Sequence, residues 1–409
     1  MIRKPTRRQF NVTALATAFA ATLPAPFVRA ASKNYGPGAS DTEIKLGQTV
    51  PHSGPGSLYG ALGRVGEAYF QMLNDKGGIN GRKIKFLSAD DSYSPPKCVE
   101  ATRRLVEQDE VLALFGSLGT ATQTAVHKYL NAKGVPQLLL NSGASKWNDP
   151  KNFKWTMAGL PLYPTEARIL AKHVVATRPN ARIAILYQND DFGRDFLGPF
   201  KKVLQEAGGT AQVVIEQSYD LTEPTVDSQL INLSKSGADV FFNISTGKAA
   251  SQSIRKVAEL GWKPLHLLFS SSTGRTILSA AGLDNAAGIV AIRYAKESGV
   301  PLWANDPDVL AFEELRKTYL PNVDPDNTIA FVGYGQAVTM AEVLRRCGDD
   351  LTRANVLTQA IGLGGYRSPY LLEGVSHSFS ADDYTPMKTL FISRFNGKEW
   401  DISDKPVTE

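Results

Sequence analysis

Three short segments rich in glycine, serine and threonine offer the clearest binding chemistry in this sequence. They cover residues 51–60, 116–123 and 141–145, and each directly follows a run of β-forming residues. Such segments leave backbone N–H groups exposed at helix starts, where a carboxylate or a phosphate can be held. Each one alone could be an ordinary turn capped by a serine or threonine. Three of them on one half of the chain predict a shared site for an anionic group.

Sequence patterns of enzymes and metal sites are missing. The five histidines are scattered, and no HExxH, CxxC or GxSxG motif occurs. Thr246, Gly247 and Lys248 lack the upstream glycine of a phosphate-binding P-loop. We therefore predict a chain that is not an enzyme and that uses neither a metal nor a cofactor.

The elements that must position these segments follow a regular alternation from residue 43 onward. Residues 43–50 predict a strand, and residues 58–76 predict an amphipathic helix. The buried stripe of that helix is formed by Leu62, Val65, Tyr69 and Met72. The same rhythm of strands and helices starts again after Tyr163. This alternation predicts right-handed crossovers and mostly parallel sheets that are covered on both faces.

Two series of strands and helices indicate an α/β fold with two doubly wound lobes. No long proline- or serine-rich linker separates the series, so we expect short crossovers that suit hinge closure over a ligand. Ligands of doubly wound sheets bind beyond the carboxyl ends of the strands. The three glycine- and serine-rich segments are predicted to lie there.

The first 31 residues have the features of an export signal. They carry five basic residues and no acidic one, and their apolar stretch at 12–23 is too short to span a bilayer. Arg7 and Arg8, followed by Phe10, resemble a twin-arginine signal, which a receptor reads and which is not an anchor. We expect the mature chain to begin near Ala31 or Ser32 and to work in the periplasm.

Charge and hydropathy exclude two classes of partner. The chain has 45 basic and 40 acidic residues, and without the five basic residues of the leader the two numbers are equal. No basic stripe remains that would bind nucleic acid or an anionic membrane surface. No later run of about 18 apolar residues predicts stable membrane insertion. Cys98 and Cys347 could pair in an oxidising compartment, but their spacing alone assigns no bridge.

Several segments resemble, in their order and their residues, those of the solute-binding proteins of branched-chain amino acid ABC importers, the Leu/Ile/Val-binding family. The matching pieces are residues 53–55, 59–60, 73–81, 90–91, 116–123, 188–193, 254–261 and 330–334. The resemblance implies the type I periplasmic binding fold and a membrane permease as partner. It implies one lobe made of residues 41–156 and 292–382, and a second made of residues 157–291 and 383–409.

The resemblance also implies a substrate site between the lobes. Hydroxyls and amides of the first lobe would hold a carboxylate, an aromatic from each lobe would line or close the pocket, and an apolar wall would complete it. Thr246 stands near the place of a second-lobe aromatic that is missing here. The implied site residues are Tyr59, Thr120, Thr122, Gly143, Ser145, Phe192, Thr246, Ser271 and Phe331.

The segment after the predicted strand at 265–269 departs from the family pattern. Amino-acid binders usually present an acid there to the ligand's ammonium, whereas this chain has Ser270, Ser271 and Ser272. A desolvated ammonium without a carboxylate partner is costly. An aromatic or aliphatic carboxylate therefore becomes as good a candidate as a branched-chain amino acid. Alternatively, the serines cap a helix that starts near Gly274, and Asp190, Asp191 or Glu166 meets the ammonium.

These features together predict an extracytoplasmic solute-binding component of an ABC importer that encloses a small carboxylate. The alternative is a ligand-sensing module that acts through a receptor partner, because the same fold serves both. The sequence leaves open the ligand's identity, the oligomeric state, the pairing of the cysteines and the degree of closure without ligand.

Overall fold

Two large sheets with helices on both faces make up most of the part of the chain that the structure describes, beside one small two-stranded sheet. This structure, a computed structural model, describes residues 33–408, so the predicted export signal lies outside the described residues. The first sheet has five parallel strands in the order β3-β2-β4-β5-β6. They are β2 (Glu43–Val50), β3 (Lys83–Asp90), β4 (Ala113–Phe115), β5 (Gln137–Leu140) and β6 (Thr156–Ala158).

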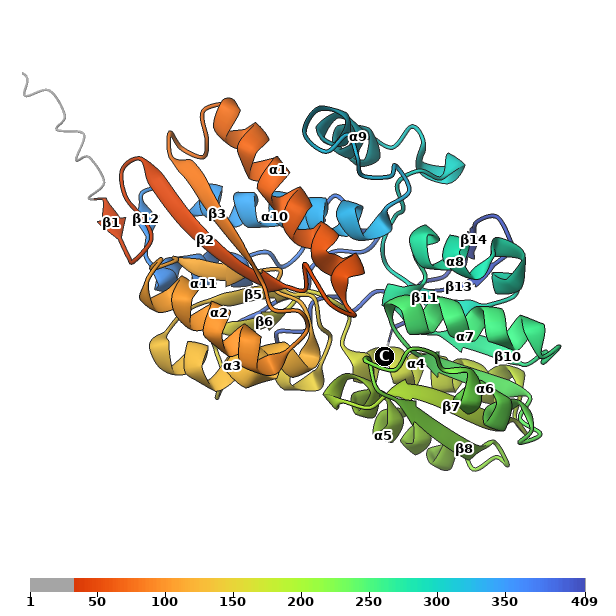
Figure 1. Ribbon diagram of the computed structural model, residues 1–409. Helices are drawn as coiled ribbons and strands as arrows, with labels where there is room; N and C mark the ends of the chain where they lie inside the picture. The colour runs from red at the N-terminus through yellow and green to blue at the C-terminus, as the bar shows by residue number, and fades with distance from the viewer. Residues whose placement is uncertain (1–32, 409) are drawn as a thin grey trace, which may run out of the picture. The chain divides into compact units, whose positions relative to one another are not determined.

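Helices cover both faces of the first sheet (Figure 1). On one face α1 (Ala61–Asp75) packs against α10 (Thr328–Cys347), and on the other α2 (Pro95–Glu107) packs against α3 (Thr120–Lys133). In the predicted stripe of α1, Leu62, Val65 and Tyr69 are buried and Met72 is partly buried. The lobe also contains β1 (Asn34–Tyr35), η1 (Ser57–Gly60), η2 (Ser145–Trp147), η5 (Pro301–Trp303), α9 (Pro307–Tyr319), β12 (Asp350–Leu351) and α11 (Arg353–Ile361).

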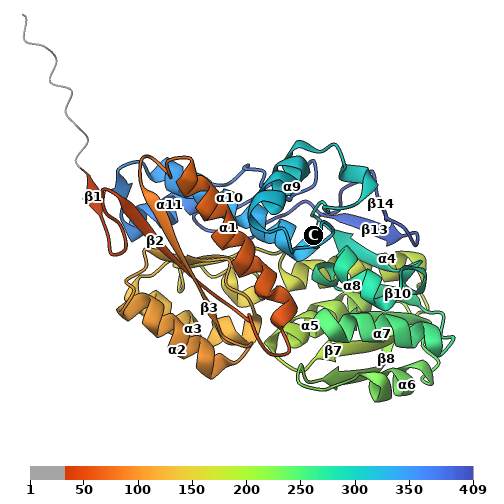
Figure 2. The same ribbon diagram turned by 45° about the horizontal axis from the view of Figure 1, so that its top comes forward.

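The second sheet has seven strands in the order β14-β13-β11-β10-β9-β7-β8. Its parallel strands are β7 (Arg182–Gln188), β8 (Gln212–Tyr219), β9 (Val240–Ile244), β10 (Leu265–Leu268) and β11 (Val290–Arg293). Two antiparallel strands, β13 (Phe391–Phe395) and β14 (Trp400–Ile402), extend one edge. Figure 2 shows the helices beside this sheet. They are α4 (Tyr163–Thr177), α5 (Asp191–Glu206), α6 (Asp227–Ser234), α7 (Gly247–Glu259), η3 (Ser270–Ser272), α8 (Arg275–Ala281) and η4 (Leu283–Ala286).

The chain passes between the lobes after β6, after β11 and again before β13. Strand β6 extends the first sheet to residue 158, and β11 extends the second to residue 293, so each strand runs two residues past the boundary expected at 156 or 291. The last two connections pair with each other, because the Lys296 N–H donates to the Tyr370 carbonyl and the Leu372 N–H donates to the Tyr294 carbonyl. The lobes are therefore joined by paired extended segments.

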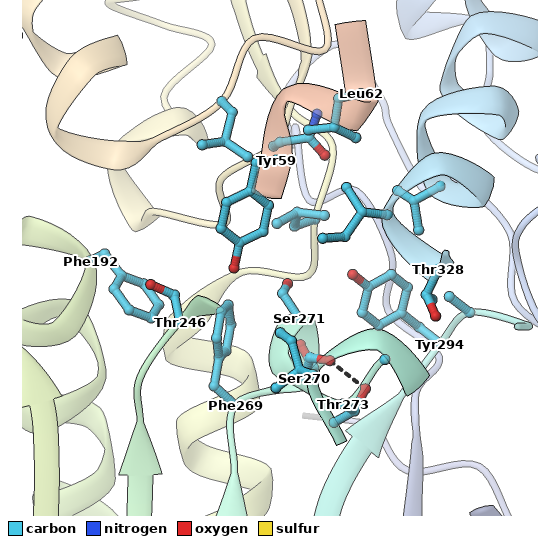
Figure 3. Close-up of a pocket in the computed structure, with 18 of the residues that line it drawn as sticks. Tyr59, Leu62, Phe192, Thr246, Phe269, Ser270, Ser271, Thr273, Tyr294 and Thr328 are labelled. Carbon is cyan, nitrogen blue, oxygen red and sulfur yellow. Dashed lines mark hydrogen bonds between the residues drawn. The ribbon is translucent and has the colours of Figure 1, made fainter. Parts of the chain in front are cut away.

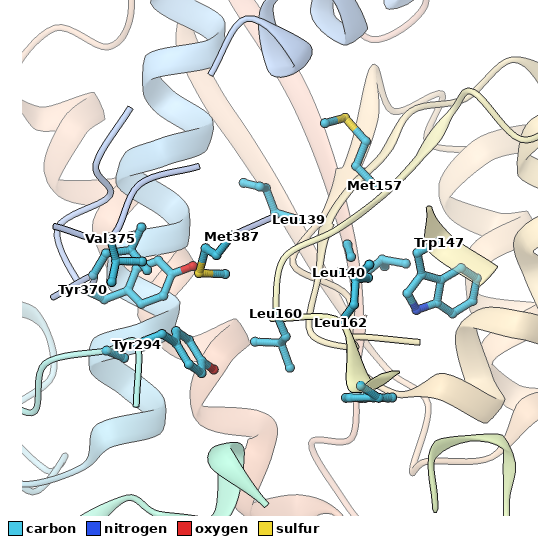
Figure 4. Close-up of a cluster of buried hydrophobic side chains, with 14 of the residues drawn as sticks. Leu139, Leu140, Trp147, Met157, Leu160, Leu162, Tyr294, Tyr370, Val375 and Met387 are labelled. Atoms are coloured by element: carbon cyan, nitrogen blue, oxygen red, sulfur yellow. The ribbon is translucent and has the colours of Figure 1, made fainter. Parts of the chain in front are cut away.

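One hydrophobic core continues from the first lobe into these connections. Leu140 of β5 and Met157 of β6 belong to the same buried cluster as Leu160, Tyr294 and Tyr370 (Figure 4). Close-packed interiors resist deformation. We therefore expect the lobes to move about this region as nearly rigid bodies.

The two cysteines do not form a disulfide and are shielded from solvent. Cys98 and Cys347 are both free and buried. Burial raises the pKa of each thiol to about 12, so both stay protonated and unreactive near neutral pH. Within residues 33–408, no helix combines the length and the apolar character needed to cross a membrane.

Candidate functional site

A cavity lies between the lobes, at the carboxyl ends of strands from both sheets (Figure 3). Its volume is about 120 Å³, counted as the space open to the centre of a water molecule. One water needs about 10–15 Å³ in this measure, so the cavity has room for roughly ten water-sized groups. The space therefore suits a molecule the size of an amino acid or of a small aromatic acid.

Aromatic rings dominate the second-lobe side of this cavity. Phe192 lies at the start of α5, directly after β7, and Phe269 directly follows β10. Their ring centroids are 4.8 Å apart, and Tyr163 packs edge-on against both at 5.1 and 5.7 Å. Leu62, Leu160, Ile292, Ile329 and Val332 extend the apolar wall. An apolar or aromatic group of a ligand would be buried here.

One hydroxyl on the cavity wall lacks a hydrogen-bond partner among the described residues. Ser271, in the 3₁₀ turn η3, has a buried Oγ without a well-formed hydrogen bond. The Tyr294 hydroxyl lies close enough to influence it, but the two do not form a regular hydrogen bond. Buried polar atoms in native proteins are nearly always hydrogen-bonded. A polar group of a ligand would satisfy Ser271.

Two threonines place further hydroxyls on the cavity wall from opposite lobes. Thr120 is the first residue of α3, and its hydroxyl lies 2.8 Å from that of Ser142. Thr246, after β9, donates its hydroxyl hydrogen bond to Gln188 at 2.9 Å. Thr120 thus lies at a helix N-terminus, which favours a negative ligand group.

Tyr59 closes the cavity from the first lobe. Its hydroxyl accepts a hydrogen bond from the Gly247 N–H of the second lobe at 3.1 Å. Burial raises the pKa of Tyr59 to about 12, so the phenol stays neutral. A second pocket lies on the far side of Tyr59 and shares Tyr93 and Thr246 with the first. Tyr59 therefore lies between two neighbouring pockets, and its hydrogen bond to Gly247 brings the lobes into contact there.

Among the described residues, Arg293 is the one charged side chain on the cavity wall. Its guanidinium donates to Glu297 at 2.6 Å and to the Thr273 hydroxyl, and lies 5.2 Å from the centre of the Trp400 ring. The ion pair with Glu297 is buried. The wall thus carries a positive charge that is already paired within the protein.

A buried acid stands behind the serine turn. Glu166 Oε1 accepts the Ser270 N–H at 2.8 Å, and Oε2 accepts the Ser270 hydroxyl at 2.7 Å. Glu166 is fully buried, and this burial raises the pKa of its carboxyl to about 7 although the Ser270 bonds lower it. The carboxyl does not itself reach the cavity wall.

The other two candidate acids have different partners. Asp190 caps α5 by accepting the N–H groups of Phe192 and Gly193 at 3.0 and 3.3 Å. Asp191 forms an exposed ion pair with Lys146 at 2.6 Å. Within the described part of the chain, no carboxylate therefore lines the cavity where a ligand ammonium could meet it. The serines also do not cap α8, since Gly274 precedes that helix and no side chain bonds to its end.

Five of the nine residues expected at the site lie on the cavity wall. They are Tyr59, Thr120, Phe192, Thr246 and Ser271. The other four do not line it, and the candidate site is revised at these positions. Thr122 points back into its own loop, where its hydroxyl donates to the Leu118 carbonyl at 2.7 Å. Phe331 is fully buried against Phe312 on the outer side of the lobe.

The remaining two belong to contacts beside the cavity. A Cβ on Gly143 would lie 2.0 Å from the Pro161 carbonyl oxygen, so this glycine allows the first connection to pack closely. Ser145 bridges the lobes, since its N–H and hydroxyl donate to Asp195 at 2.7 and 2.8 Å. The positions of both residues depend on how the loop after β5 folds.

The sequence interpretation missed four aromatic residues of the wall, Tyr93, Tyr163, Phe269 and Tyr294. Phe269 and Tyr294 each directly follow a strand, β10 and β11, so the rule that ligands bind after strands could have indicated both. The strand before Tyr294 was not predicted. Tyr163 begins α4 after the first connection, and no local pattern marks it.

A family model described as periplasmic binding protein matches residues 43–399. The "Leu/Ile/Val-binding protein homolog 7" of Brucella abortus is 26% identical over 243 residues, which cover 57% of this chain and 60% of that protein. The matched region thus spans less than two thirds of the curated relative.

Solved structures share the fold. One is a branched chain amino acid ABC transporter protein from Thermus thermophilus with bound valine, with a TM-score of 0.80, 18% identity and coverage of 90% of this chain and 97% of that one. Another is an ABC transporter solute binding protein from R. palustris in complex with benzoate, with a TM-score of 0.73, 18% identity and coverage of 90% and 98%. The type I periplasmic binding fold expected from the sequence is confirmed.

Proposed function

Because the chain belongs to the periplasmic binding protein family, we propose that it is the extracytoplasmic solute-binding component of an ABC importer. The family and its structural neighbours bind solutes and are not enzymes, and this chain is a binding protein. Its proposed ligand is a small carboxylate that the two lobes enclose. Its proposed partner is a membrane permease, which would receive the ligand when the lobes open.

The hydroxyl of Ser271, which lacks a hydrogen-bond partner on a largely apolar cavity wall, is the observation that supports this proposal best. A buried polar group without a partner costs roughly 1–3 kcal/mol. A ligand carboxylate would accept its hydrogen bond, and the Thr120 hydroxyl at the start of α3 offers a second donor. Valine and benzoate, which two structural neighbours hold, both carry a carboxylate.

We propose further that the ligand lacks an α-amino group. The aromatic wall of Tyr163, Phe192 and Phe269 suits an aromatic or a branched aliphatic body. None of the described residues on the cavity wall is acidic, and an ammonium enclosed there would lose its hydration without a matching charge. A branched-chain amino acid remains the competing ligand.

The place of action is part of the proposal. Export to the periplasm rests on the leader sequence, whose adjacent Arg7 and Arg8 support the twin-arginine route. The division of the chain into two lobes, with connections near residues 158 and 293, is proposed to form the hinge.

Thermal-shift measurements followed by calorimetry on the purified protein test this function. The matched pairs are 3-phenylpropanoate with phenylalanine, and 4-methylpentanoate with leucine. Ligand binding to the folded state raises its apparent stability, and we expect the deaminated member of at least one pair to bind as well as its amino acid or better. If no member of either pair binds, and no compound from a wider set of carboxylates binds, the proposed function is refuted. Amino acids that bind a hundredfold more tightly would refute the ligand class.

A further inference from the structure

Glu166 controls which hydrogen bonds Ser270 can offer to the cavity. Ser270 lies on the cavity wall, and both its N–H and its hydroxyl donate to the Glu166 carboxylate. An ionised carboxylate only accepts hydrogen bonds. While Glu166 is ionised, the Ser270 hydroxyl therefore presents only its lone pairs to a ligand, with a negative charge directly behind it.

Within the described chain, no cation neutralises this carboxylate. Beyond β11, Arg293 and Glu297 pair with each other at 2.6 Å, and the pKa of Glu166 is set by burial and by its two bonds to Ser270. The Tyr294 hydroxyl faces Glu166 from the same strand end, and burial keeps that phenol neutral. On the neighbouring helix α5, Asp195 is bonded to Ser145. Glu166 is thus a buried acid whose charge only Ser270 supports, and burial raises the pKa of its carboxyl to about 7.

We propose that Glu166 is a specificity-determining residue that takes up one proton from solvent when the cavity closes over an anionic ligand. This inference rests on the proposed function. The protonated carboxyl would donate its O–H to Ser270 Oγ, and the Ser270 hydroxyl would turn and donate to the ligand carboxylate. One proton enters with one anion, so the charge of the closed cavity is unchanged.

The sign of the pH dependence follows from the repulsion between the ligand anion in the cavity and the Glu166 carboxylate behind Ser270. An anionic ligand raises the pKa of Glu166 further, so proton uptake on binding appears as the pH rises above about 7. Linkage of one proton weakens affinity by at most about tenfold per pH unit in that range. Simple carboxylate ligands stay ionised throughout it, since carboxyl groups of this kind titrate near pH 4 to 5.

Calorimetry of 3-phenylpropanoate binding between pH 6 and 9, in pairs of buffers with different ionisation enthalpies, counts the protons directly. For the unaltered protein we expect uptake that approaches one proton at high pH, and an affinity that falls roughly tenfold or more over that range. If 3-phenylpropanoate does not bind, 4-methylpentanoate and benzoate replace it. Binding without proton uptake would refute the role of Glu166 and leave the proposed function standing.

The variant Glu166→Gln sharpens the result. Its amide can accept the Ser270 N–H and donate to Ser270 Oγ, as the protonated acid would. We expect this variant to keep tight binding of the anion at pH 9 without proton uptake. Asp195→Asn is the matched control, because Asp195 holds Ser145 by the same two bonds outside the cavity. Proton uptake that persists in Glu166→Gln would overturn the inference, and so would uptake that disappears only in Asp195→Asn. If the unaltered protein binds no carboxylate at all, the proposed function itself is overturned.

Discussion

Two carboxylate–serine pairs in this protein have the same hydrogen bonds and different surroundings. Glu166 accepts the N–H and hydroxyl of Ser270 at 2.8 and 2.7 Å, and Asp195 accepts those of Ser145 at 2.7 and 2.8 Å. The first pair lies within the second lobe, and Glu166 is fully buried. The second pair joins the two lobes, and its serine is exposed.

The difference shows that burial, rather than the number of hydrogen bonds, separates the roles of the two pairs. Burial raises the pKa of both carboxyls, and the hydrogen bonds from serine oppose the shift in each. For Asp195, the nearby Lys146 also lowers the pKa, whereas no cation among residues 33–408 lowers the pKa of Glu166. We therefore interpret the exposed pair as a contact between lobes and the buried pair as a control on ligand charge.

The largest expected effect concerns stability against pH in Glu166→Gln. The pKa of Glu166 in the folded state, about 7, lies above the value of 4.5 for a solvent-exposed glutamate. The folded state therefore holds a proton that the unfolded state releases, and this contribution to stability is present at pH 4.5 and lost as pH rises to 7. The integrated loss is about 3 kcal/mol at most, so the variant should gain that much relative to the unaltered protein.

Denaturant unfolding of both proteins at pH 5, 6, 7 and 8 measures this difference. Comparison of the two proteins removes the opposing contribution of the buried histidines, His127, His266 and His377, whose lowered pKa values destabilise the fold at acidic pH. Asp195→Asn should show a smaller change in the same direction. If the difference in the free energy of unfolding between the two proteins does not change with pH, the pKa of Glu166 is not raised by folding.

The next effect separates the cavity hydroxyls from the contact between lobes. Thr120→Ala and Ser271→Ala each remove a donor that is proposed to hold the ligand carboxylate. A hydrogen bond to a charged group contributes roughly 1.5–3 kcal/mol, so each change should weaken binding about tenfold or more. Ser145→Ala, whose hydroxyl bonds to Asp195, should weaken it less. If calorimetry shows the largest loss of affinity for Ser145→Ala, the ligand binds outside the cavity described above.

A smaller effect is expected from the tyrosine that closes the cavity. Tyr59→Phe removes the hydrogen bond to the Gly247 N–H and keeps the ring. A neutral hydrogen bond contributes about 0.5–1.5 kcal/mol, so the ligand should dissociate roughly two- to tenfold faster. Stopped-flow kinetics measures the dissociation rate, and small-angle scattering checks that the ligand still makes the particle more compact. An unchanged dissociation rate would show that Tyr59 does not retain the ligand.

The smallest effect belongs to the exposed ion pair beside Ser145. Lys146 and Asp191 are 35% and 47% exposed, and surface pairs of this kind contribute about 0–1 kcal/mol. Lys146→Ala should change ligand affinity less than twofold to threefold, and raising the salt concentration should erase the change. A large, salt-insensitive loss would show that this pair is a main determinant of closure.

The sequence by itself determined the pattern of elements and the edge at which the site lies. The strand predicted at residues 43–50 is β2, and the helix predicted at 58–76 corresponds to η1 followed by α1, which ends at Asp75. Apolar periodicity and turn residues are local properties, so they can be read without knowledge of the fold. The same loops indicated Tyr59 and Thr120, because the position after a strand places both on the cavity wall.

Only the tertiary structure decided which side chains share the site and which acid stands behind it. Ser145 and Ser271 both follow strands in serine-rich segments, yet one faces Asp195 across the lobes and the other faces the cavity. Glu166 meets Ser270 across 104 residues of sequence, because α4 packs beside the end of β10. The ionisation of that carboxyl depends on how completely neighbouring elements exclude water from it, and this exclusion is a property of packing that no local pattern in the sequence contains.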